Sequence, residues 1–269
     1  MKTLLKVVLL AVAFTALPSI ARADCPTSET SYEMTSGEGM TLLHVCITER
    51  GSIRVFESPV GSKLIGGLEI APGQTAISAE GFGFCDFSGG NKNYFDYQTF
   101  NLGFTQTGPD PIFHQPQGPG TFPLTVIRTS DDRVWTVIQT FSLHKTYPPS
   151  LQVKLTLRNN TGTARFANLL RVTEPQVYSV NPAPPSTFNY NSESAFAFNW
   201  GITGLYIQNP NPSQPVSLIL TPSEPTSACN TLNPAPPNFV GFGTIVAHGA
   251  PQSVPPHSSV TLTLLYKRM

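Results

Sequence analysis

The sequence is poor in charged residues. Asp, Glu, Lys and Arg make up only 12% of the 269 residues, and the formal net charge is +0. No basic patch indicates a nucleic-acid partner, and no polybasic run indicates an anionic membrane surface. We therefore expect no nucleic acid among the partners of this protein.

The sequence also lacks the motifs that carry familiar chemistry. It contains no H-E-x-x-H, no G-x-S-x-G, no C-x-x-C and no phosphate-binding P-loop. The histidines are spread along the chain without helical i, i+4 spacing: His44, His114, His144, His248 and His257. We therefore predict no metal site and no cofactor.

Long hydrophobic runs are scarce, and the one clear run lies near the N-terminus. Val7 to Leu17 follows a basic start and precedes Ala21-Arg22-Ala23, a small-residue cleavage pattern. These features predict a secretory signal peptide over 1–23, and the run is too short to span a bilayer. Without this segment 13 basic and 16 acidic residues remain. We expect a secreted protein, extracellular or periplasmic, with no transmembrane segment in the mature chain.

Cysteine is rare, with four residues: Cys25, Cys46, Cys85 and Cys229. In an exported chain this number indicates two disulfides, for which three connectivities exist. Local pairing favours Cys25–Cys46 together with Cys85–Cys229.

Helix-forming stretches are missing after residue 23, whereas strand signals are frequent. Proline occurs 26 times, and no long stretch combines Ala, Leu, Glu and Lys without it. In the clearest strand, Leu151 to Arg158, every second residue is apolar. Such segments, separated by Gly, Pro and Asn turns, predict an all-β fold: a large antiparallel β-sandwich of about 14–16 short strands with proline-rich loops.

The order of these signals predicts several hairpins. Segment 122–173 is interpreted as a four-stranded antiparallel meander with polar turns between its strands. Segments 42–48 and 52–57 form a hairpin, and a single strand from Lys63 to Ile70 follows. The alternation from Val260 to Tyr266 predicts a terminal strand docked in a sheet.

A single β-sandwich domain is predicted over 24–269, because no polar linker or composition shift divides 24–173. The alternative is two packed β-domains, 24–173 and 174–269. The later part carries the similar words Asn181-Pro-Ala-Pro-Pro185 and Asn233-Pro-Ala-Pro-Pro237. Proline donates no ladder hydrogen bond, so these words predict loops and sheet edges, which could form a binding rim.

The stretch 80–97, EGFGFCDFSGGNKNYFDY, is the first candidate for a functional site. Phe82 and Phe84 alternate with glycines, Cys85 follows, and the polar segment 88–93 indicates a turn, so the stretch is predicted to be a hairpin pinned by a disulfide. Glu80, Tyr94 and Asp96 are candidate ligand contacts if their face of the hairpin points to water.

Aromatic residues provide further candidates, because Tyr and Trp rings stack on sugar faces. Tyr190 and Trp200 lie in the loop-rich later part. The complete set of candidate binding residues is Glu80, Tyr94, Asp96, Tyr190 and Trp200.

The main functional hypothesis is a non-catalytic extracellular protein that binds a glycan, an envelope component or a protein partner, or that is purely structural. The alternative is a carbohydrate-active enzyme, a hydrolase or lyase, that uses a carboxylate pair on the same fold. Convergence of Glu80, Asp96, His114 and Glu174 in one cleft would favour the enzyme. Fold alone does not separate these roles.

Overall fold

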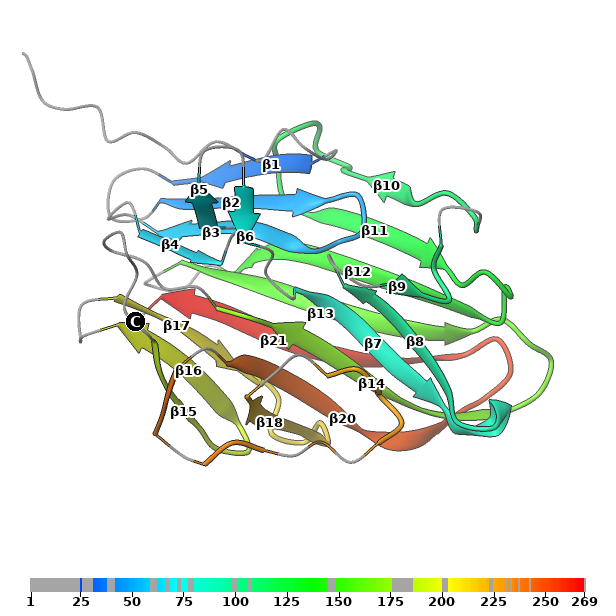
Figure 1. The fold of residues 1–269 in the computed structure, drawn as a ribbon. Helices are drawn as coiled ribbons and strands as arrows, with labels where there is room; N and C mark the ends of the chain where they lie inside the picture. Colours follow the sequence, from blue (N-terminus) through cyan, green and yellow to red (C-terminus); the bar gives the residue numbers. More distant parts are fainter. Residues whose placement is uncertain are drawn as a thin grey trace, which may run out of the picture.

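The computed structural model describes residues 25, 31–37, 42–58, 62–65, 68–71, 74–76, 80–97, 101–105, 108–144, 149–175, 186–199, 203–222, 225–230, 232, 234–236, 238–241 and 243–268. In these ranges the chain consists of antiparallel strands and one short 3₁₀ helix, η2 (Phe87–Gly89). Figure 1 shows the two large sheets packed face to face, which confirms the predicted all-β sandwich. No helix in these ranges has the length and apolar character to cross a bilayer. The predicted signal peptide and Trp200 lie outside the described residues.

One layer of the sandwich is a nine-stranded sheet. In spatial order its strands are β10 (Ile112–His114), β11 (Leu124–Thr129), β12 (Trp135–His144), β13 (Ser150–Asn159), β21 (Ser259–Arg268), β17 (Thr203–Gln208), β16 (Ser194–Asn199), β15 (Ser186–Tyr190) and β19 (Phe239–Gly241). The terminal strand β21 pairs with β13 on one side and β17 on the other. The sheet therefore joins strands that lie far apart in the sequence.

The other layer is a six-stranded sheet. Its spatial order is β18 (Val216–Thr221), β20 (Thr244–Val254), β14 (Arg165–Thr173), β7 (Gly81–Asp86), β8 (Lys92–Tyr97) and β9 (Asn101–Leu102). β14 pairs with β20 and β7 and is therefore interior to this sheet.

A smaller sheet of four strands completes the core. Its strands are β1 (Ser31–Ser36), β2 (Leu43–Thr48), β3 (Ile53–Ser58) and β4 (Ser62–Ile65), and a separate hairpin holds β5 (Leu68–Ala71) and β6 (Gln74–Ala76). Every residue of β2 is buried. Leu43, Val45 and Ile47 belong to the same hydrophobic cluster as the interior of the sandwich, so this sheet shares its core.

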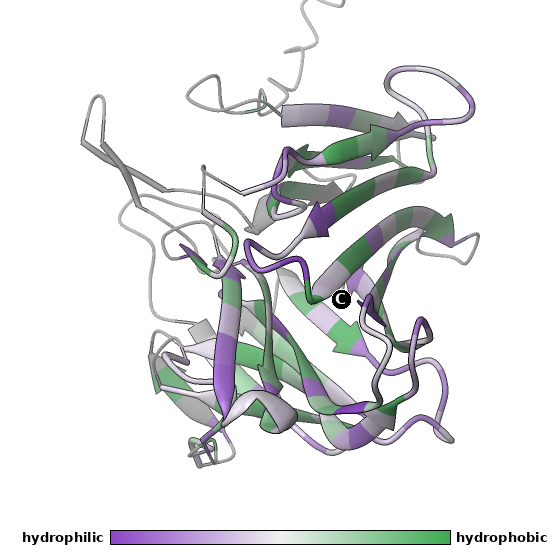
Figure 2. Cartoon of the chain, turned by 90° about the vertical axis from the view of Figure 1, so that its right-hand side faces the viewer, coloured by the Kyte–Doolittle hydropathy of each residue, from purple (hydrophilic) through white to green (hydrophobic). Residues whose placement is uncertain are grey.

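The alternation of apolar and polar residues determines which strand face turns inward. In β13 the apolar residues Leu151, Val153, Leu155 and Leu157 are buried, whereas the intervening polar residues are partly or fully exposed. Figure 2 shows the resulting alternation of hydrophobic and hydrophilic bands along the strands. Full burial of each such side chain contributes about 1.5–3 kcal/mol, so alternation strongly fixes the register.

The predicted four-stranded meander is wrong in its last strand. β11, β12 and β13 pair in sequence, but β14 joins the other sheet instead of pairing with β13. The reason is a corner at the end of β13. There the side-chain amide of Asn159 donates to the carbonyl oxygens of Thr163 and Val254, at 2.7 and 3.0 Å, which ties the turn to the end of β20.

Two other strand predictions need correction. The single strand expected from Lys63 to Ile70 is divided into β4 and β5, with two glycines between them, and glycine weakens a strand interior. The described residues form 21 strands rather than 14–16, because several are only two or three residues long.

Both disulfides have the favoured connectivity. Cys25 pairs with Cys46 across 21 residues, and Cys85 pairs with Cys229 across 144 residues. The ring of His44 lies 3.9 Å from the Cys46 sulfur, which makes Cys25, His44 and Cys46 a cluster of metal-ligand residue types. Its two sulfurs are joined to each other, and metal binding by cysteine requires the thiolate.

Candidate functional site

The stretch 80–97 forms the predicted hairpin, and both of its faces are covered. β7 and β8 pair with Phe82 opposite Asp96 and Phe84 opposite Tyr94. These side chains point into the sandwich, whereas Phe95 and Tyr97 belong to a second cluster on the other side of the sheet. All four residues from Tyr94 to Tyr97 are at most 1% exposed.

Glu80 links the three sheets through a buried ion pair with Arg171. Both side chains are fully buried and in direct contact. Glu80 accepts a hydrogen bond from the backbone N–H of Ile53 at 2.6 Å, and Arg171 donates to Gln139 Oε1 at 2.5 Å and to the Gly51 carbonyl at 3.2 Å. Burial raises the pKa of Glu80 to about 7, although the Arg171 guanidinium acts in the opposite direction.

Gly51 is required for this arrangement. Its φ of +80° lies in the left-handed region, and a Cβ at this position would lie 2.0 Å from Gln139 Nε2. The turn that the sequence shows as Glu49-Arg50-Gly51 therefore serves to bring the backbone close to the central ion pair.

Tyr94 is also used inside the fold. Its ring stacks on Phe84 with a centroid distance of 4.5 Å, and its hydroxyl donates to Asp132 at 2.6 Å. Burial, followed by the hydrogen bond to Asp132, raises the pKa of Tyr94. The side chain is 1% exposed and has no surface for a ligand.

Asp96 forms the second buried ion pair, with Arg128 of β11. The Nε of Arg128 donates to Asp96 at 2.9 Å, and its Nη2 donates to the Phe104 carbonyl at 3.1 Å. Burial raises the pKa of Asp96 to about 6, against the effect of Arg128. Arg128 and Arg50 also line a pocket of about 270 Å³ at this edge of the sandwich, which we call the Arg128 pocket. Asp96 itself is fully buried and does not line it.

The interior positions correct the expectation that Glu80, Tyr94 and Asp96 contact a ligand. Their face points into the sandwich, where the two carboxylates are paired with arginines and the Tyr94 hydroxyl is hydrogen-bonded to Asp132. Tyr190 is half-buried on β15, and its hydroxyl donates to the Ala235 carbonyl at 2.8 Å. Convergence of four residues in one cleft would favour an enzyme: Glu80, Asp96, His114 and Glu174. None of them lines the Arg128 pocket. Two further pockets lie on the outer face of the six-stranded sheet, and none of the four residues lines these either.

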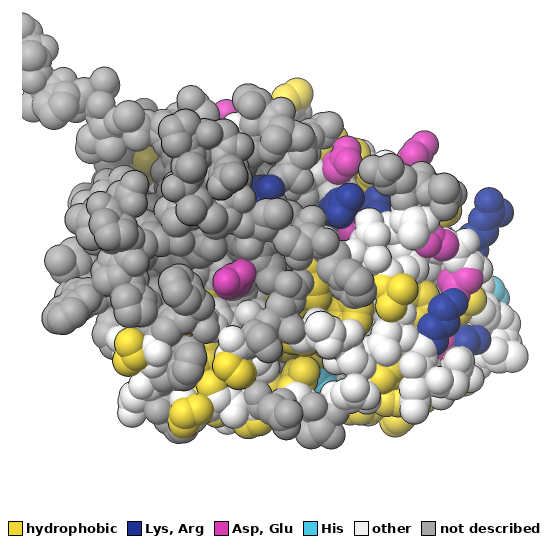
Figure 3. Space-filling view, in the orientation of Figure 1, with side chains coloured by type: hydrophobic (Ala, Val, Ile, Leu, Met, Phe, Trp, Pro, Cys, Tyr) yellow, Lys and Arg dark blue, Asp and Glu magenta, His cyan; other side chains and the backbone are white. Residues whose placement is uncertain are grey.

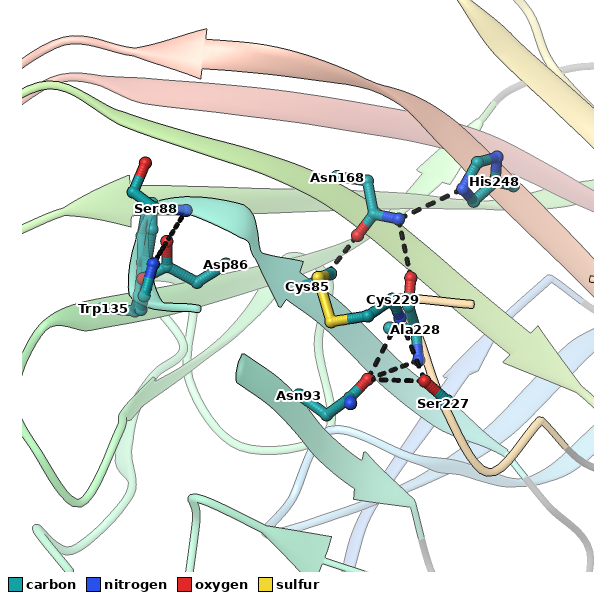
Figure 4. Close-up of a disulfide and its surroundings, with 11 residues drawn as sticks. Cys85, Asp86, Ser88, Asn93, Trp135, Asn168, Ser227, Ala228, Cys229 and His248 are labelled. Carbon is teal, nitrogen blue, oxygen red and sulfur yellow. Dashed lines mark hydrogen bonds between the residues drawn. A yellow bond between two sulfur atoms is a disulfide. The ribbon is translucent and has the colours of Figure 1, made fainter. Parts of the chain in front are cut away.

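The outer face of the six-stranded sheet presents a different arrangement, centred on Asn168 of β14. The pairing of β14 with β20 is irregular here: Ala250 and Pro251 of β20 stand opposite the single residue Asn168, so β20 has a β-bulge beside Asn168. Bulges re-aim side chains and are frequent beside active sites. Asn168 accepts a hydrogen bond from the Cys85 N–H at 2.7 Å and donates to the Ala228 carbonyl at 2.8 Å (Figure 4).

Residues 225–230, which we call the strap, are fastened over part of this outer face. The Cys85–Cys229 disulfide joins the strap to β7. Asn93 of β8 accepts hydrogen bonds from the Ala228 and Cys229 N–H groups at 2.7 and 3.1 Å. Figure 4 shows these contacts converging on the strap from two neighbouring strands. The strap is therefore fixed by covalent and polar contacts to the sheet beneath it.

Two adjoining pockets lie on this outer face and share Ser217, His248 and Pro251; we call them together the His248 groove. The first, of about 370 Å³, is also lined by Ser192, Glu193 and Asn209. The second, of about 320 Å³, is also lined by Asn168 and by the strap residue Cys229. Figure 3 shows that uncharged and hydrophobic side chains dominate the surface over β18 and β20, whereas charged side chains gather elsewhere on this face.

The protonation of His248 follows from its contact with Asn168. The carbonyl oxygen of the Asn168 side chain faces the Cys85 N–H, so its amide nitrogen faces His248 Nε2, at 3.2 Å. Because an amide nitrogen only donates, Nε2 accepts and the ring proton is on Nδ1. Burial lowers the pKa of His248, which keeps the ring neutral near pH 7.

An aromatic pair borders the second pocket. Phe87 lines it, and the ring of Phe166 lies 5.8 Å from that of Phe87. Phe166 is 45% exposed, which is unusual for a phenylalanine and supplies apolar surface beside the polar groove.

The groove residues were not indicated by the sequence. His248 belongs to a strand in which Ile245 and Ala247 point inward, so the alternation could have placed it on the outer face. Asn168 interrupts an apolar segment of β14, which is a further signal. The covering strap lies about sixty residues beyond Asn168, and no local pattern connects the two.

Comparisons with known proteins concern the fold. No family model matches this chain, and no curated protein matches it. A bacterial glucoamylase solved in complex with acarbose is similar over 93% of this chain, with a TM-score of 0.53 and 9% identity. The matched part is 34% of the glucoamylase chain, so this protein spans about a third of its length.

Two smaller proteins are similar with lower scores. A galactose mutarotase-like protein from Lactobacillus casei gives a TM-score of 0.49 at 9% identity, covering 88% of this chain and 100% of that one. A putative aldose 1-epimerase from Escherichia coli K12 gives 0.45 at 11% identity, covering 89% and 99%. At such identities the glucoamylase match shows a shared sandwich fold, and the two weaker matches add nothing to the argument.

Proposed function

We propose that this protein is an extracellular carbohydrate-binding protein and that the His248 groove is its binding site. The observation that carries the proposal is a groove of fixed polar groups beside an exposed aromatic ring. Sugar rings offer hydroxyls on their rim and C–H groups on their faces. A site for them needs oriented hydrogen-bond partners together with apolar surface.

The orientation of the polar groups supports binding. Asn168 makes three polar contacts, with Cys85, Ala228 and His248, so its amide cannot rotate without breaking them. The contact of the Asn168 amide nitrogen with His248 in turn fixes the ring proton of His248 on Nδ1. Groups that are held in place before a ligand arrives lose little entropy on binding.

A second candidate function is chemistry on a sugar in the same groove. Glu193 and His248 line the first pocket together, and a carboxylate with a neutral imidazole can act as a general acid–base pair. This candidate replaces the carboxylate pair expected from the sequence, because Glu80 and Asp96 are both fully buried.

The proposal is tested with the full mature chain on a panel of immobilised polysaccharides. We expect retention on at least one glycan, and loss of that retention in His248→Ala. His114→Ala is the matched control, because His114 is exposed on β10 of the other sheet. Retention on no glycan, or equal retention by both variants, would contradict the proposal. Release of reducing sugar by the wild type, lost in Glu193→Gln, would favour the enzyme.

A further inference from the structure

Each of the two pockets of the groove has both polar and apolar walls. Among the described residues, the first pocket contributes polar side chains from the β15–β16 turn and the segment after β17, namely Ser192, Glu193 and Asn209. The first pocket is also lined by prolines, Val216 and Ala250. The second contributes apolar side chains such as Phe87 and Leu232 together with the polar Asn168 and Asn230. Each pocket can therefore receive both the hydroxyl rim and the apolar face of a sugar ring.

His248 stands at the junction of the two pockets, since it lines both of them. Its Nε2 is occupied by Asn168 at 3.2 Å, which leaves the Nδ1 proton as the donor available to a ligand. A donor between two pockets is suited to an oxygen that bridges two units of a ligand or to a hydroxyl beside that bridge.

The charges of the groove limit the class of ligand. Of the described residues that line the two pockets, Glu193 and His248 are the ones with an acidic or basic side chain, and burial lowers the pKa of His248, which favours the neutral ring. The exposed carboxylate of Glu193 therefore sets the local charge, which is negative. A polyanionic glycan would be repelled, because no lysine or arginine lines either pocket within the described residues.

We propose that the His248 groove binds two consecutive residues of an uncharged glycan, one in each pocket, with His248 at the linkage between them. This inference rests on the proposed function and adds to it the length and the charge of the glycan that binds. Both pockets, at about 370 and 320 Å³, lie at the small end of the range for ligand pockets, so each suits one sugar ring.

Calorimetric titration of the full mature chain tests this with four oligosaccharide series, each of one, two and three units. The maltose, cellobiose and chitobiose series are uncharged, and the galacturonate series is anionic. For at least one uncharged series we expect the disaccharide to bind about tenfold more tightly than the monosaccharide, since a second filled pocket adds on the order of 1.4 kcal/mol. The trisaccharide should bind no more than about twofold more tightly than the disaccharide.

Two variants test whether the second sugar unit of the disaccharide occupies the pocket that Glu193 lines. Glu193→Ala should remove most of the gain from monosaccharide to disaccharide. Asp110→Ala, which removes an exposed carboxylate from a different part of the surface, should keep that gain. Circular dichroism and the urea midpoint of each variant show whether it is folded.

The outcomes separate the two proposals. Equal affinity for one and two units, or tighter binding of the galacturonates, would overturn this inference and leave the groove as a carbohydrate site. A gain that survives Glu193→Ala would also overturn it. Absence of binding in all four series would overturn the proposed function itself.

Discussion

The two faces of the six-stranded sheet use polar residues in opposite ways. On the inner face, Glu80 and Asp96 are fully buried and each is paired with an arginine. On the outer face, Asn168 and His248 are held in place but line open pockets. The more highly charged face is thus the one closed to ligands. The buried ion pairs thus hold the sheets together, whereas the candidate site combines neutral polar residues with one carboxylate, that of Glu193.

The buried ion pair of Glu80 with Arg171 has a clear physical role. The Glu80–Arg171 pair contacts Ile53 of the small sheet, Gly51 in the turn between β2 and β3, and Gln139 of the nine-stranded sheet. A buried ion pair adds little net stability compared with apolar residues, but an unmatched buried charge is costly. The pair therefore penalises any arrangement in which the three sheets do not meet in this register.

Removing one partner of the buried Glu80–Arg171 ion pair should have the largest effect on stability. Arg171→Met leaves Glu80 buried without its partner, and we expect the free energy of unfolding at pH 7 to fall by about 3–5 kcal/mol. Urea denaturation followed by tryptophan fluorescence measures this. The double variant Glu80→Gln with Arg171→Met removes both charges and should recover most of the loss. A decrease below about 1 kcal/mol in Arg171→Met would contradict the role given to this pair.

Opening the disulfide of the outer face should have the next largest effect. Replacing Cys85 and Cys229 with alanine frees the strap, and we expect a loss of about 2–4 kcal/mol together with loss of glycan binding. Replacing Cys25 and Cys46 with alanine is the matched control. It should lower stability but keep binding, because neither residue lines the groove. Equal binding by both variants would show that the strap does not form the site.

The buried carboxyls of Glu80 and Asp96 on the inner face should also make the stability of the protein depend on pH. The folded-state pKa of Glu80, about 7, lies above its ordinary value of 4.5, and that of Asp96, about 6, lies above 3.8. The folded protein therefore binds these protons more tightly than the unfolded chain. Their contribution is fully present below the ordinary values and is lost as the pH rises through about 6 to 7.

Urea midpoints at pH 5 and pH 8 measure this dependence. We expect the wild type to be less stable at pH 8 by on the order of 1–3 kcal/mol. The double variant Glu80→Gln with Arg171→Met lacks one of the titrating carboxyls and should show a smaller change. His248 opposes the trend, because its lowered pKa favours the folded state as the pH rises to about 6.5. An increase in stability from pH 5 to pH 8 would contradict the raised pKa values.

The smallest expected effect concerns the aromatic border of the groove. Phe166→Ala should have only a small effect on stability, of about 0.5–1 kcal/mol, because nearly half of the residue is exposed. It should weaken glycan binding by about threefold to fivefold, through loss of the ring that supports Phe87. Ile112→Ala, another exposed apolar residue, should leave binding unchanged. Unchanged binding by Phe166→Ala would remove the aromatic pair from the site.

The sequence predicted what depends on local patterns. The alternation in β13 and β21, the hairpin over 80–97 and the favoured disulfides all appear in the structure. Alternation in 94–97 also separates Tyr94 and Asp96 from Phe95 and Tyr97, as observed. It could not reveal that both faces are covered, because Arg128 and the strap come from distant parts of the chain.

The candidate site could not be predicted for the same reason. Asn168 is oriented by Cys85, Ala228 and His248, which belong to three different segments. The route of β14 into the opposite sheet was equally hidden, since it depends on the contact of Asn159 with Val254. A polar residue in a strand acquires a role only when the partners that fix it are known.

The most direct test of the central claim is an NMR titration of the isotope-labelled protein, residues 24–269, with the disaccharide that binds it most tightly. The side-chain amide of Asn168 and the ring of His248 report on the outer face, and the side-chain amide of Gln139 reports on the inner face. We predict shifts of the Asn168 and His248 signals with a common affinity, and none for Gln139. Shifts centred on Gln139, with Asn168 and His248 unmoved, would contradict the account.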